Sequence, residues 1–343
     1  MKIRARFLKV WTMALLVFSV SGANADSLEN FCSNPYKTVC ERQQNAKTRT
    51  GRIEAIEKRL SDRALDETFE YLYGSKNRPS SFTLDDITYM PKKTQRRRAL
   101  GVFYASLRQQ FRAYLKQNHV PTDLGITELK SHLSRAIELS KEIPEENKAK
   151  MQDLLQQTRL IAFNDLDPDE EGALTTSDIN KIYKGCTKNH FLDNAFADSN
   201  KKGEMFVIIC PGEIVGSIEF SKDYEIPQKY QLVPLIMTLG HELSHHFDFS
   251  VMPEAYSTTL KSVMAMKDEL KHSKIENYMG EITADLWGIK SFVVATRNME
   301  PEFQMAFIKG AVNDLCSTED DGIHPSGEFR INRLLPPYIC PAR

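Results

Sequence analysis

Residues 240 to 248 read Gly-His-Glu-Leu-Ser-His-His-Phe-Asp and contain the pattern H-E-x-x-H at His241, Glu242 and His245. Two helical residues four positions apart are rotated by only about 40° relative to each other, so both imidazoles can bind one metal ion. The carboxylate of Glu242 then lies beside that ion, where it can act as a general base. The pattern therefore predicts a helix from about 233 to 245 that carries a zinc-hydrolase site.

A third metal ligand is expected downstream, because a catalytic zinc ion takes three protein ligands and keeps one position open for water. Glu281 is the predicted third ligand, on a helix expected from 277 to 296. Asp285 follows one turn later on the same face, where it can accept a hydrogen bond from the far ring nitrogen of a ligating histidine. His272 is a rival ligand that lacks such a partner. The expected cofactor is one Zn²⁺ ion, held by two histidines and one glutamate.

Near the end of the chain, His324 and Arg330 are candidates for transition-state chemistry. In peptide hydrolysis Glu242 would take a proton from water and pass it to the leaving amine. The tetrahedral intermediate also needs a donor for its oxyanion, and we assign this role to His324, which Pro325 keeps out of helical geometry. Arg330 lies on the helix that follows, and a structural salt bridge is its alternative role.

An apolar run precedes the proposed active helix. Met205 to Cys210 predicts a strand that ends at Pro211, and a second strand is expected from Ile214 to Phe220. Asn194 and Ala195 come before the run. Taken alone, Asn194 and Ala195 are typical of a turn, and the apolar run is typical of a strand buried in the hydrophobic core. Before a zinc-peptidase helix, the same order predicts an edge strand that binds extended substrate by β-augmentation.

Residues 26 to 163 have a helical pattern and few chemical motifs. Apolar residues recur at three- and four-residue spacing in 52–73, 94–117 and 126–141. Between Lys92 and Lys116 there are eight basic residues and no acidic ones. We interpret them as a solvated helix face, with an anionic partner or a membrane surface as the alternative. The region is expected to serve as a lid or to bind a partner.

An acidic segment marks the predicted boundary with a catalytic domain over 164–343. Counted from Asp167, its oxygen-bearing residues and glycine fall partly in the spacing of an EF-hand calcium loop. The calcium ligands in this interpretation would be Asp167, Asp169, Glu171 and Asp178. An acidic turn that caps the following helix is the alternative.

The first 25 residues predict a signal peptide. A basic start is followed by an apolar run from 11 to 20 that is too short to span a bilayer, and then by Ala-Asn-Ala at 23–25. We therefore expect an exported protein, periplasmic or secreted, without a stable membrane anchor. Removing these residues leaves 41 basic against 46 acidic side chains, a charge near −5 that argues against nucleic-acid binding.

The number and position of the cysteines agree with the predicted export of the protein. All six follow residue 25, and an even number in an exported chain predicts up to three disulfides, with 15 connectivities allowed. Buried free thiols are the alternative.

Several of these motifs together resemble the neprilysin family of gluzincin metallopeptidases. The matching residues are Asn194-Ala195-Phe196, Pro211-Gly212, the H-E-x-x-H pattern followed by Phe247-Asp248, Glu281 to Asp285, and His324 to Arg330. This resemblance implies a thermolysin-like catalytic fold, substrate binding by Asn194, Ala195 and Arg330, and an oxyanion-stabilising His324. It covers roughly residues 190 to 340, and the chain is about half the length usual in that family.

A second gluzincin group, the HtpX-like and CAAX-prenyl-protease family, is also similar to this chain. Its Asn-Ala-Phe-Ala motif matches residues 194–197, and its Glu-x-x-Ala-Asp and late His-Pro motifs have counterparts at Glu281 and His324. The zinc ligands and the general base would be the same in either family.

The sequence thus predicts a mainly α protein with a small β-sheet, in which an N-terminal helical region flanks a thermolysin-like catalytic domain. The expected activity is that of a zinc endopeptidase acting on peptide or protein substrates. Two alternatives stay open: an inactive peptidase homologue that acts as a binding module, and a calcium-binding interaction protein built on Asp167 to Asp178.

Overall fold

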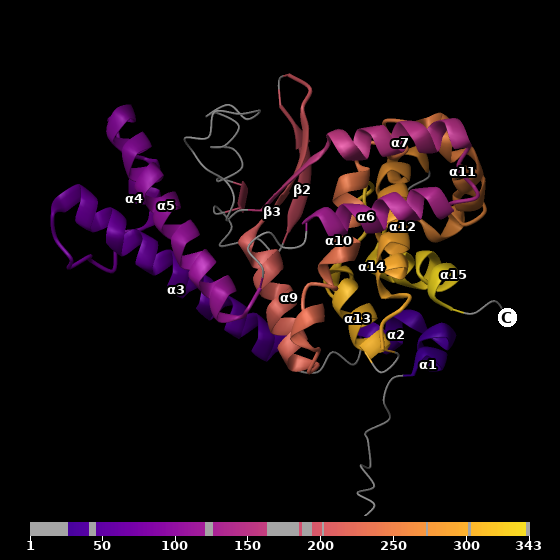
Figure 1. Cartoon of the computed structure of the whole chain (residues 1–343), viewed down its shortest axis with the longest axis horizontal. Helices are drawn as coiled ribbons and strands as arrows, with labels where there is room; N and C mark the ends of the chain where they lie inside the picture. Colours follow the sequence, from indigo (N-terminus) through magenta and orange to yellow (C-terminus); the bar gives the residue numbers. More distant parts are fainter. Residues whose placement is uncertain are drawn as a thin grey trace, which may run out of the picture.

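The computed structural model describes residues 27–40, 46–120, 126–162, 185–186, 194–200, 202–271, 274–300 and 303–340. Within these ranges the chain is mainly helical with a small three-stranded sheet, which confirms the predicted fold class at this level (Figure 1). The predicted signal peptide, the acidic segment with its four calcium candidates, and His272 lie outside the described residues.

Two short helices begin the described chain and a helical arm follows. The short helices are α1 (Leu28–Ser33) and α2 (Pro35–Cys40), and the arm consists of α3 (Ala46–Tyr73), α4 (Leu84–Thr88) and α5 (Lys93–Gln117). Helices α3 and α5 pack against each other and project from the rest of the molecule (Figure 1). Their bounds confirm the helices expected at 52–73 and 94–117.

Ion pairs with the largely buried Glu219 and Asp223 fix the base of the arm to α9 (Pro211–Asp223). Arg52 Nε lies 2.9 Å from Glu219 Oε2, and Arg52 Nη2 lies 2.6 Å from Asp223 Oδ1. Arg49 Nη1 reaches the other oxygen of Asp223 at 3.3 Å, and both Arg49 and Glu219 are buried. Breaking one partner of a buried pair leaves an uncompensated charge, so this contact holds the arm in a defined position.

The sheet has the strand order β1-β3-β2, formed by β1 (Arg159–Ala162), β2 (Ala195–Ser199) and β3 (Met205–Ile209). Strand β3 is parallel to β1 and antiparallel to β2, with Ala195 opposite Ile209 and Ser199 opposite Met205. The run at 205–210 is therefore the central strand, and the expectation that it forms an edge is wrong. Among the described strands, β2 is the edge strand that precedes the helix with the H-E-x-x-H pattern.

The strand expected from Ile214 to Phe220 is also wrong, because these residues belong to α9. Pro211 occupies the first turn of this helix, where its fixed φ and missing N–H are tolerated. The apolar residues of α9 are buried on almost all sides, so the segment lacks the periodic polar face by which an amphipathic helix is recognised.

The body of the molecule is built around α10 (Leu235–Ser244) and α12 (Glu276–Thr296), which confirm the helices expected at 233–245 and 277–296. Helix α6 (Ile126–Leu139) packs on α12 and α10, and α7 (Glu145–Gln157) packs on α6. The contacts of α6 and of β1 cross the predicted domain boundary at 163/164. The remaining helices are α11 (Ser257–Met264), α13 (Gln304–Ala311), α14 (Gly327–Phe329) and α15 (Pro336–Ile339), and the short turns are η2 (Gln228–Tyr230), η3 (Pro253–Tyr256), η4 (Lys267–Glu269), η6 (Asp314–Ser317) and the π-helical η7 (Arg330–Leu334).

Three disulfides join the six cysteines and confirm the expected bonding. They are Cys32–Cys340, Cys40–Cys316 and Cys186–Cys210. The first two tie α1 and α2 to the end of the chain, and the segment that carries His324 and Arg330 lies between Cys316 and Cys340. Such bonds are typical of proteins that fold in an oxidising environment. No helix among the described residues has the length and hydrophobicity needed to cross a membrane.

Candidate metal centre

The three predicted zinc ligands meet between α10 and α12. One ligand atom from each of His241, His245 and Glu281 lies within 4.8 Å of the others. The two Nε2 atoms are 3.1 Å apart, and the carboxylate oxygens of Glu281 lie 3.3 Å from His241 Nε2 and 3.9 Å from His245 Nε2. Tetrahedral zinc with bonds of about 2.0–2.2 Å separates its ligand atoms by about 3.3 Å. The triad therefore has the dimensions of a zinc site.

A carboxylate holds the far nitrogen of each histidine. His241 Nδ1 lies 2.9 Å from Asp285 Oδ1, and His245 Nδ1 lies 2.8 Å from Asp248 Oδ2. Asp248 and Asp285 are both buried. An ionised carboxylate only accepts hydrogen bonds, so each Nδ1 donates and each Nε2 presents its lone pair to the centre of the triad.

This arrangement of acceptors needs a cation. Two imidazole lone pairs face each other at 3.1 Å, and Glu281 Oε2 beside them is buried without a hydrogen-bond donor in the described part of the chain. A buried acceptor without a partner is costly, and three of them at one point repel each other. A proton or a metal ion between them removes this cost, so the donor set fits a bound metal.

The pKa values of the surrounding groups follow the same pattern. Burial would lower the pKa of His241, but the hydrogen bond to Asp285 and the neighbouring Glu281 raise it to about 10. Burial would raise the pKa of Asp285, but the charge of Arg330 and the bond to His241 lower it to about 2. The pKa of Glu281 is also held below its usual value, against the effect of burial, by the histidines. The site thus keeps its carboxylates ionised and attracts positive charge.

Glu242 lies at the edge of the triad without belonging to it. Its Oε1 is 3.9 Å from His241 Nε2, and its Oε2 accepts a 3.0 Å hydrogen bond from the backbone N–H of Ala197. Burial raises the pKa of this carboxyl group. A more basic carboxylate beside a metal is suited to accept a proton from water near neutral pH.

The bond from Ala197 places the edge strand β2 next to the metal centre. Alternate residues of an edge strand direct their backbone groups away from the neighbouring strand, so Ala195 and Ser199 share the direction of Ala197. Asn194, at the start of β2, is exposed, and its carbonyl accepts the N–H of Cys210 at 3.1 Å. Of the two predicted substrate-binding residues here, Ala195 is buried in β2 and Asn194 faces solvent.

His324 also lies at the centre. Its Nε2 is 3.5 Å from Glu281 Oε2, and its Nδ1 is 2.8 Å from Asp321 Oδ2. Asp321 in addition accepts the backbone N–H groups of Ile323 and His324 at 2.9 and 2.7 Å. These backbone bonds and the imidazole hold the pKa of Asp321 well below its usual range. The side chain of His324 is 42% exposed, which leaves room for a ligand in front of it.

Arg330 is paired with Asp285, the carboxylate that holds His241. Its Nε donates to Asp285 Oδ2 at 2.6 Å, and its Nη2 donates to Asp285 Oδ1. The residue is buried. Arg330 therefore forms a structural salt bridge, which is the alternative role predicted for it. This salt bridge fixes the carboxylate of Asp285, which orients His241. Contact between Arg330 and substrate stays a prediction.

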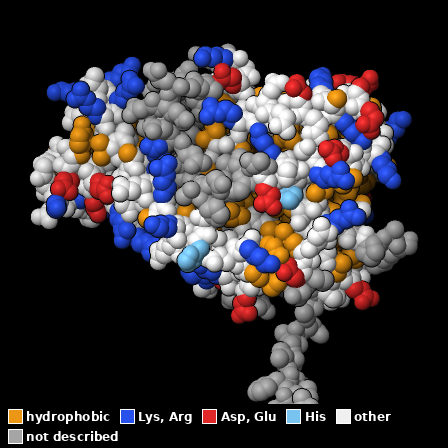
Figure 2. Space-filling model, in the orientation of Figure 1, with side chains coloured by type: hydrophobic (Ala, Val, Ile, Leu, Met, Phe, Trp, Pro, Cys, Tyr) orange, Lys and Arg blue, Asp and Glu red, His pale blue; other side chains and the backbone are white. Residues whose placement is uncertain are grey.

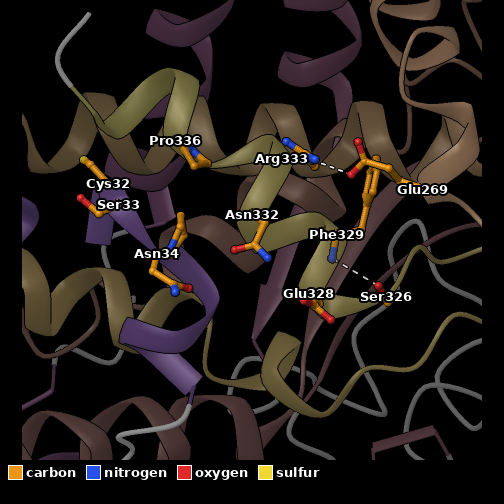
Figure 3. Close-up of a pocket in the computed structure, with 11 residues that line it drawn as sticks. Cys32, Ser33, Asn34, Glu269, Ser326, Glu328, Phe329, Asn332, Arg333 and Pro336 are labelled. Carbon is orange, nitrogen blue, oxygen red and sulfur yellow. Dashed lines mark hydrogen bonds and ion pairs between the residues drawn. The ribbon is translucent and has the colours of Figure 1, made fainter. Parts of the chain in front are cut away.

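The segment that carries Arg330 also borders a cavity of about 620 Å³ that is lined by none of the triad residues. Phe329, Asn332, Arg333 and Pro336 are among the residues that line it (Figure 3). In the wall of this cavity, Arg333 Nε donates a 2.5 Å hydrogen bond to Glu269 Oε2. The cavity lies between the chain's two disulfide-linked ends, and the chemistry described above does not use it.

Two glycines bring α10 and α12 close enough to form the site. A Cβ on Gly288 would lie 2.5 Å from the carbonyl oxygen of Met237, and a Cβ on Gly240 would lie 3.0 Å from the Cα of Gly288. The close crossing therefore sets the distance between His241 on α10 and Glu281 on α12.

We expect Gly288→Ala to lower the free energy of unfolding by about 2 kcal/mol, because the methyl group must push a backbone carbonyl aside. Zinc affinity should fall as well, since the helices separate. Urea denaturation and zinc titration measure the two effects. Gly101→Ala in α5 is the matched control, because nothing lies within 4 Å of its Cβ and better helix propensity should stabilise it. Equal effects of both substitutions would contradict the role of the crossing.

The sequence motifs predict no role for Asp248, Asp321 or Ala197. The two acids carry a readable signal, because each lies three residues from a histidine of the site, in His245-x-x-Asp248 and Asp321-x-x-His324. Ala197 acts through its backbone, which leaves no signal in the identity of the side chain.

No protein-family model, curated protein or solved structure matches this chain. A proposal for its function therefore depends on the geometry of the site.

Proposed function

We propose that this chain is an exported zinc endopeptidase with the thermolysin-like arrangement of the gluzincins. The observation that carries the proposal is the convergence of two histidines and a glutamate, with each histidine's Nδ1 held by a buried carboxylate. Imidazole and carboxylate donors without a thiolate are typical of catalytic rather than structural zinc sites. The neprilysin-like motifs support the same class, and the second gluzincin family shares the ligand set.

When bound, zinc supplies a Lewis acid that acidifies water and polarises a carbonyl group. Glu242 supplies the base: it takes a proton on its free Oε1 and later donates it to the leaving amine. The N–H of Ala197 restrains the other oxygen and so fixes the direction of Oε1. The raised pKa of Glu242 brings it closer to the pH at which it must both accept and release a proton.

His324 stabilises the negative charge that develops on the substrate carbonyl oxygen. Its Nδ1 is hydrogen-bonded to Asp321, so Nε2 is the ring nitrogen that faces the centre and would donate to the oxyanion. Asp321 is thus a positioning residue that fixes the direction of the His324 ring.

The substrate in this proposal is an extended, unstructured peptide along β2. The outward carbonyl groups of Ala195, Ala197 and Ser199 would accept hydrogen bonds from the peptide main chain. The N–H groups of Ala197 and Ser199 are already bound to Glu242 and Asp198. Asn194 at the start of the strand and the remaining nitrogen of Arg330 would complete the contacts to the peptide main chain.

Metal removal tests the function. We expect the purified protein to contain one zinc ion per chain, to cleave an unfolded casein or a quenched fluorescent peptide, and to lose this activity on dialysis against a chelator. Zinc addition should restore it. Cleavage by the metal-free protein would refute the proposal. Zinc binding without cleavage would indicate the inactive homologue, and calcium binding without zinc would indicate the calcium-binding interaction protein.

For His324, we expect that His324→Phe lowers kcat for peptide hydrolysis by about 10²-fold or more, as loss of an oxyanion donor does. Zinc content should stay near one per chain. Ile323→Ser, at the exposed neighbouring position, is the matched control and should change neither value. If His324→Phe instead removes the zinc, then His324 is a ligand and the assignment of Glu281 is wrong.

A further inference from the structure

The free end of the helical arm carries a group of cations without partners. This basic arm end consists of Lys92, Lys93, Arg96, Arg97 and Arg98, at the start of α5. None of their side chains makes a hydrogen bond or an ion pair with any described residue, and all but the half-buried Arg96 are exposed. Arg78 on the same arm differs, since it binds Asp62 and Asp66. Figure 2 shows Lys and Arg side chains gathered over this end of the molecule.

The position of these cations opposes the stability of the helix. The N-terminus of a helix has a partial positive charge, so cations there are unfavourable and acids are favourable. Helix α5 has no acid in its first turn and no side-chain cap on Lys92. The neighbouring α4 has the expected pattern, with Asp85 and Asp86 in its first turn. An anionic surface bound at the arm end would offset the unfavourable charge.

Exposed tyrosines accompany the cations. Seven large hydrophobic side chains are exposed among the described residues, and three of them are at this end of the arm: Tyr71 at 54%, Tyr73 at 57% and Tyr89 at 75%. Tyr71 and Tyr73 end α3, and Tyr89 ends α4. Tyrosine has an apolar ring and a polar hydroxyl, so it suits the boundary between lipid and water.

The arm separates this surface from the metal centre. Helix α5 has 25 residues, which gives it a length of about 37 Å. Its base is fixed by the ion pairs of Arg49 and Arg52 with α9. A surface bound at the arm end therefore lies away from β2 and from the helices that carry the metal centre (Figure 1).

We propose that the basic arm end, with Tyr71, Tyr73 and Tyr89, docks the protein reversibly on an anionic phospholipid membrane. Cations bind the lipid phosphates, and the tyrosine rings enter the headgroup layer. A flat membrane touches the projecting end alone, whereas a long nucleic acid would also meet the acidic remainder of the chain. The docking does not depend on peptidase activity, so it is tested separately.

The test is cosedimentation of the full exported chain with vesicles of phosphatidylcholine alone or of phosphatidylcholine mixed with phosphatidylglycerol. We expect binding to the mixed vesicles only, and weaker binding as the salt concentration rises. The variant K92Q/K93Q/R97Q/R98Q should lower the partition coefficient by about 10³-fold, given the usual contribution of each cation. Tyr71→Ser with Tyr89→Ser should weaken the binding that persists at high salt.

The matched control is K202Q/K261Q/K267Q/K274Q, which removes the same charge from exposed lysines outside the arm and should bind like the wild type. Circular dichroism and zinc content should be unchanged in both variants, which shows that they fold. Equal binding to both kinds of vesicle, or equal loss in arm and control variants, would overturn the proposal. Binding to single-stranded DNA but not to vesicles would overturn it in favour of a polyanion partner.

Discussion

Replacing Glu242 by Gln is expected to abolish measurable peptide hydrolysis while the zinc content stays at one per chain. The substitution keeps the shape of the side chain and its contact with Ala197, but glutamine cannot accept the proton from water. Loss of a general base typically costs up to about 10⁴-fold, and we expect at least about 10³-fold in kcat. The affinity for zinc should change little, because Glu242 lies 3.9 Å from His241 Nε2 and outside the triad.

The measurement is the turnover of a quenched fluorescent peptide together with zinc analysis of the same preparation. Glu276→Gln is the matched control, since it removes an exposed carboxylate from the first turn of α12 and should leave turnover unchanged. Equal cleavage by wild type and Glu242→Gln would show that water is activated in another way. A variant that has lost its zinc would instead make Glu242 a ligand.

Asp285→Ala is expected to give the largest combined loss of stability and metal affinity. Asp285 is 1% exposed and joins the ligand His241 to the buried Arg330. Its removal leaves the guanidinium without a partner, at a cost of about 3–5 kcal/mol. It also frees the imidazole to rotate, which typically lowers metal affinity by about 10–100-fold. Urea denaturation of the metal-free protein measures the first effect, and competition with a chelator measures the second.

A double variant separates these two roles. Asp285→Ala with Arg330→Met removes the unpaired charge, so stability should recover in part. Zinc affinity should stay low, because His241 still lacks its acceptor. Asp268→Ala, at an exposed position, is the control for loss of an aspartate. Full recovery of zinc affinity in the double variant would show that Asp285 acts only as the partner of Arg330.

The helices that form the site could be predicted closely from the sequence. The ligands themselves follow from helical spacing: His241 and His245 share a face of α10, and Glu281 and Asp285 share a face of α12. These relations depend on the geometry of one helix at a time, so they are readable without knowledge of the fold. The grouping of His241, His245 and Glu281 at one point confirms the predicted donor set, and zinc as the metal stays a prediction.

What could not be predicted depends on contacts between distant segments. Strand β1 at Arg159–Ala162 has only four residues and lies within the region that the sequence predicts to be helical. It is a strand because it pairs with β3. Helix α9 has no polar face because the arm covers it, and its buried Glu219 is paired with Arg52 from another helix. Local patterns in the sequence contain no information about contact partners that are distant along the chain. The role of Arg330 likewise depends on its contact with Asp285, which is 45 residues away along the chain.

A single cut in the backbone between Cys40 and Cys316 does not release a fragment from this protein. The bond between Cys40 and Cys316 closes a ring of chain with a sequence separation of 276 residues, and the bond between Cys32 and Cys340 closes a second ring around it. A nick in the arm or in an exposed loop opens these rings but leaves the pieces covalently joined until the disulfides are reduced. The proposed peptidase would therefore stay one molecule after an internal cut, including a cut made by another copy of itself.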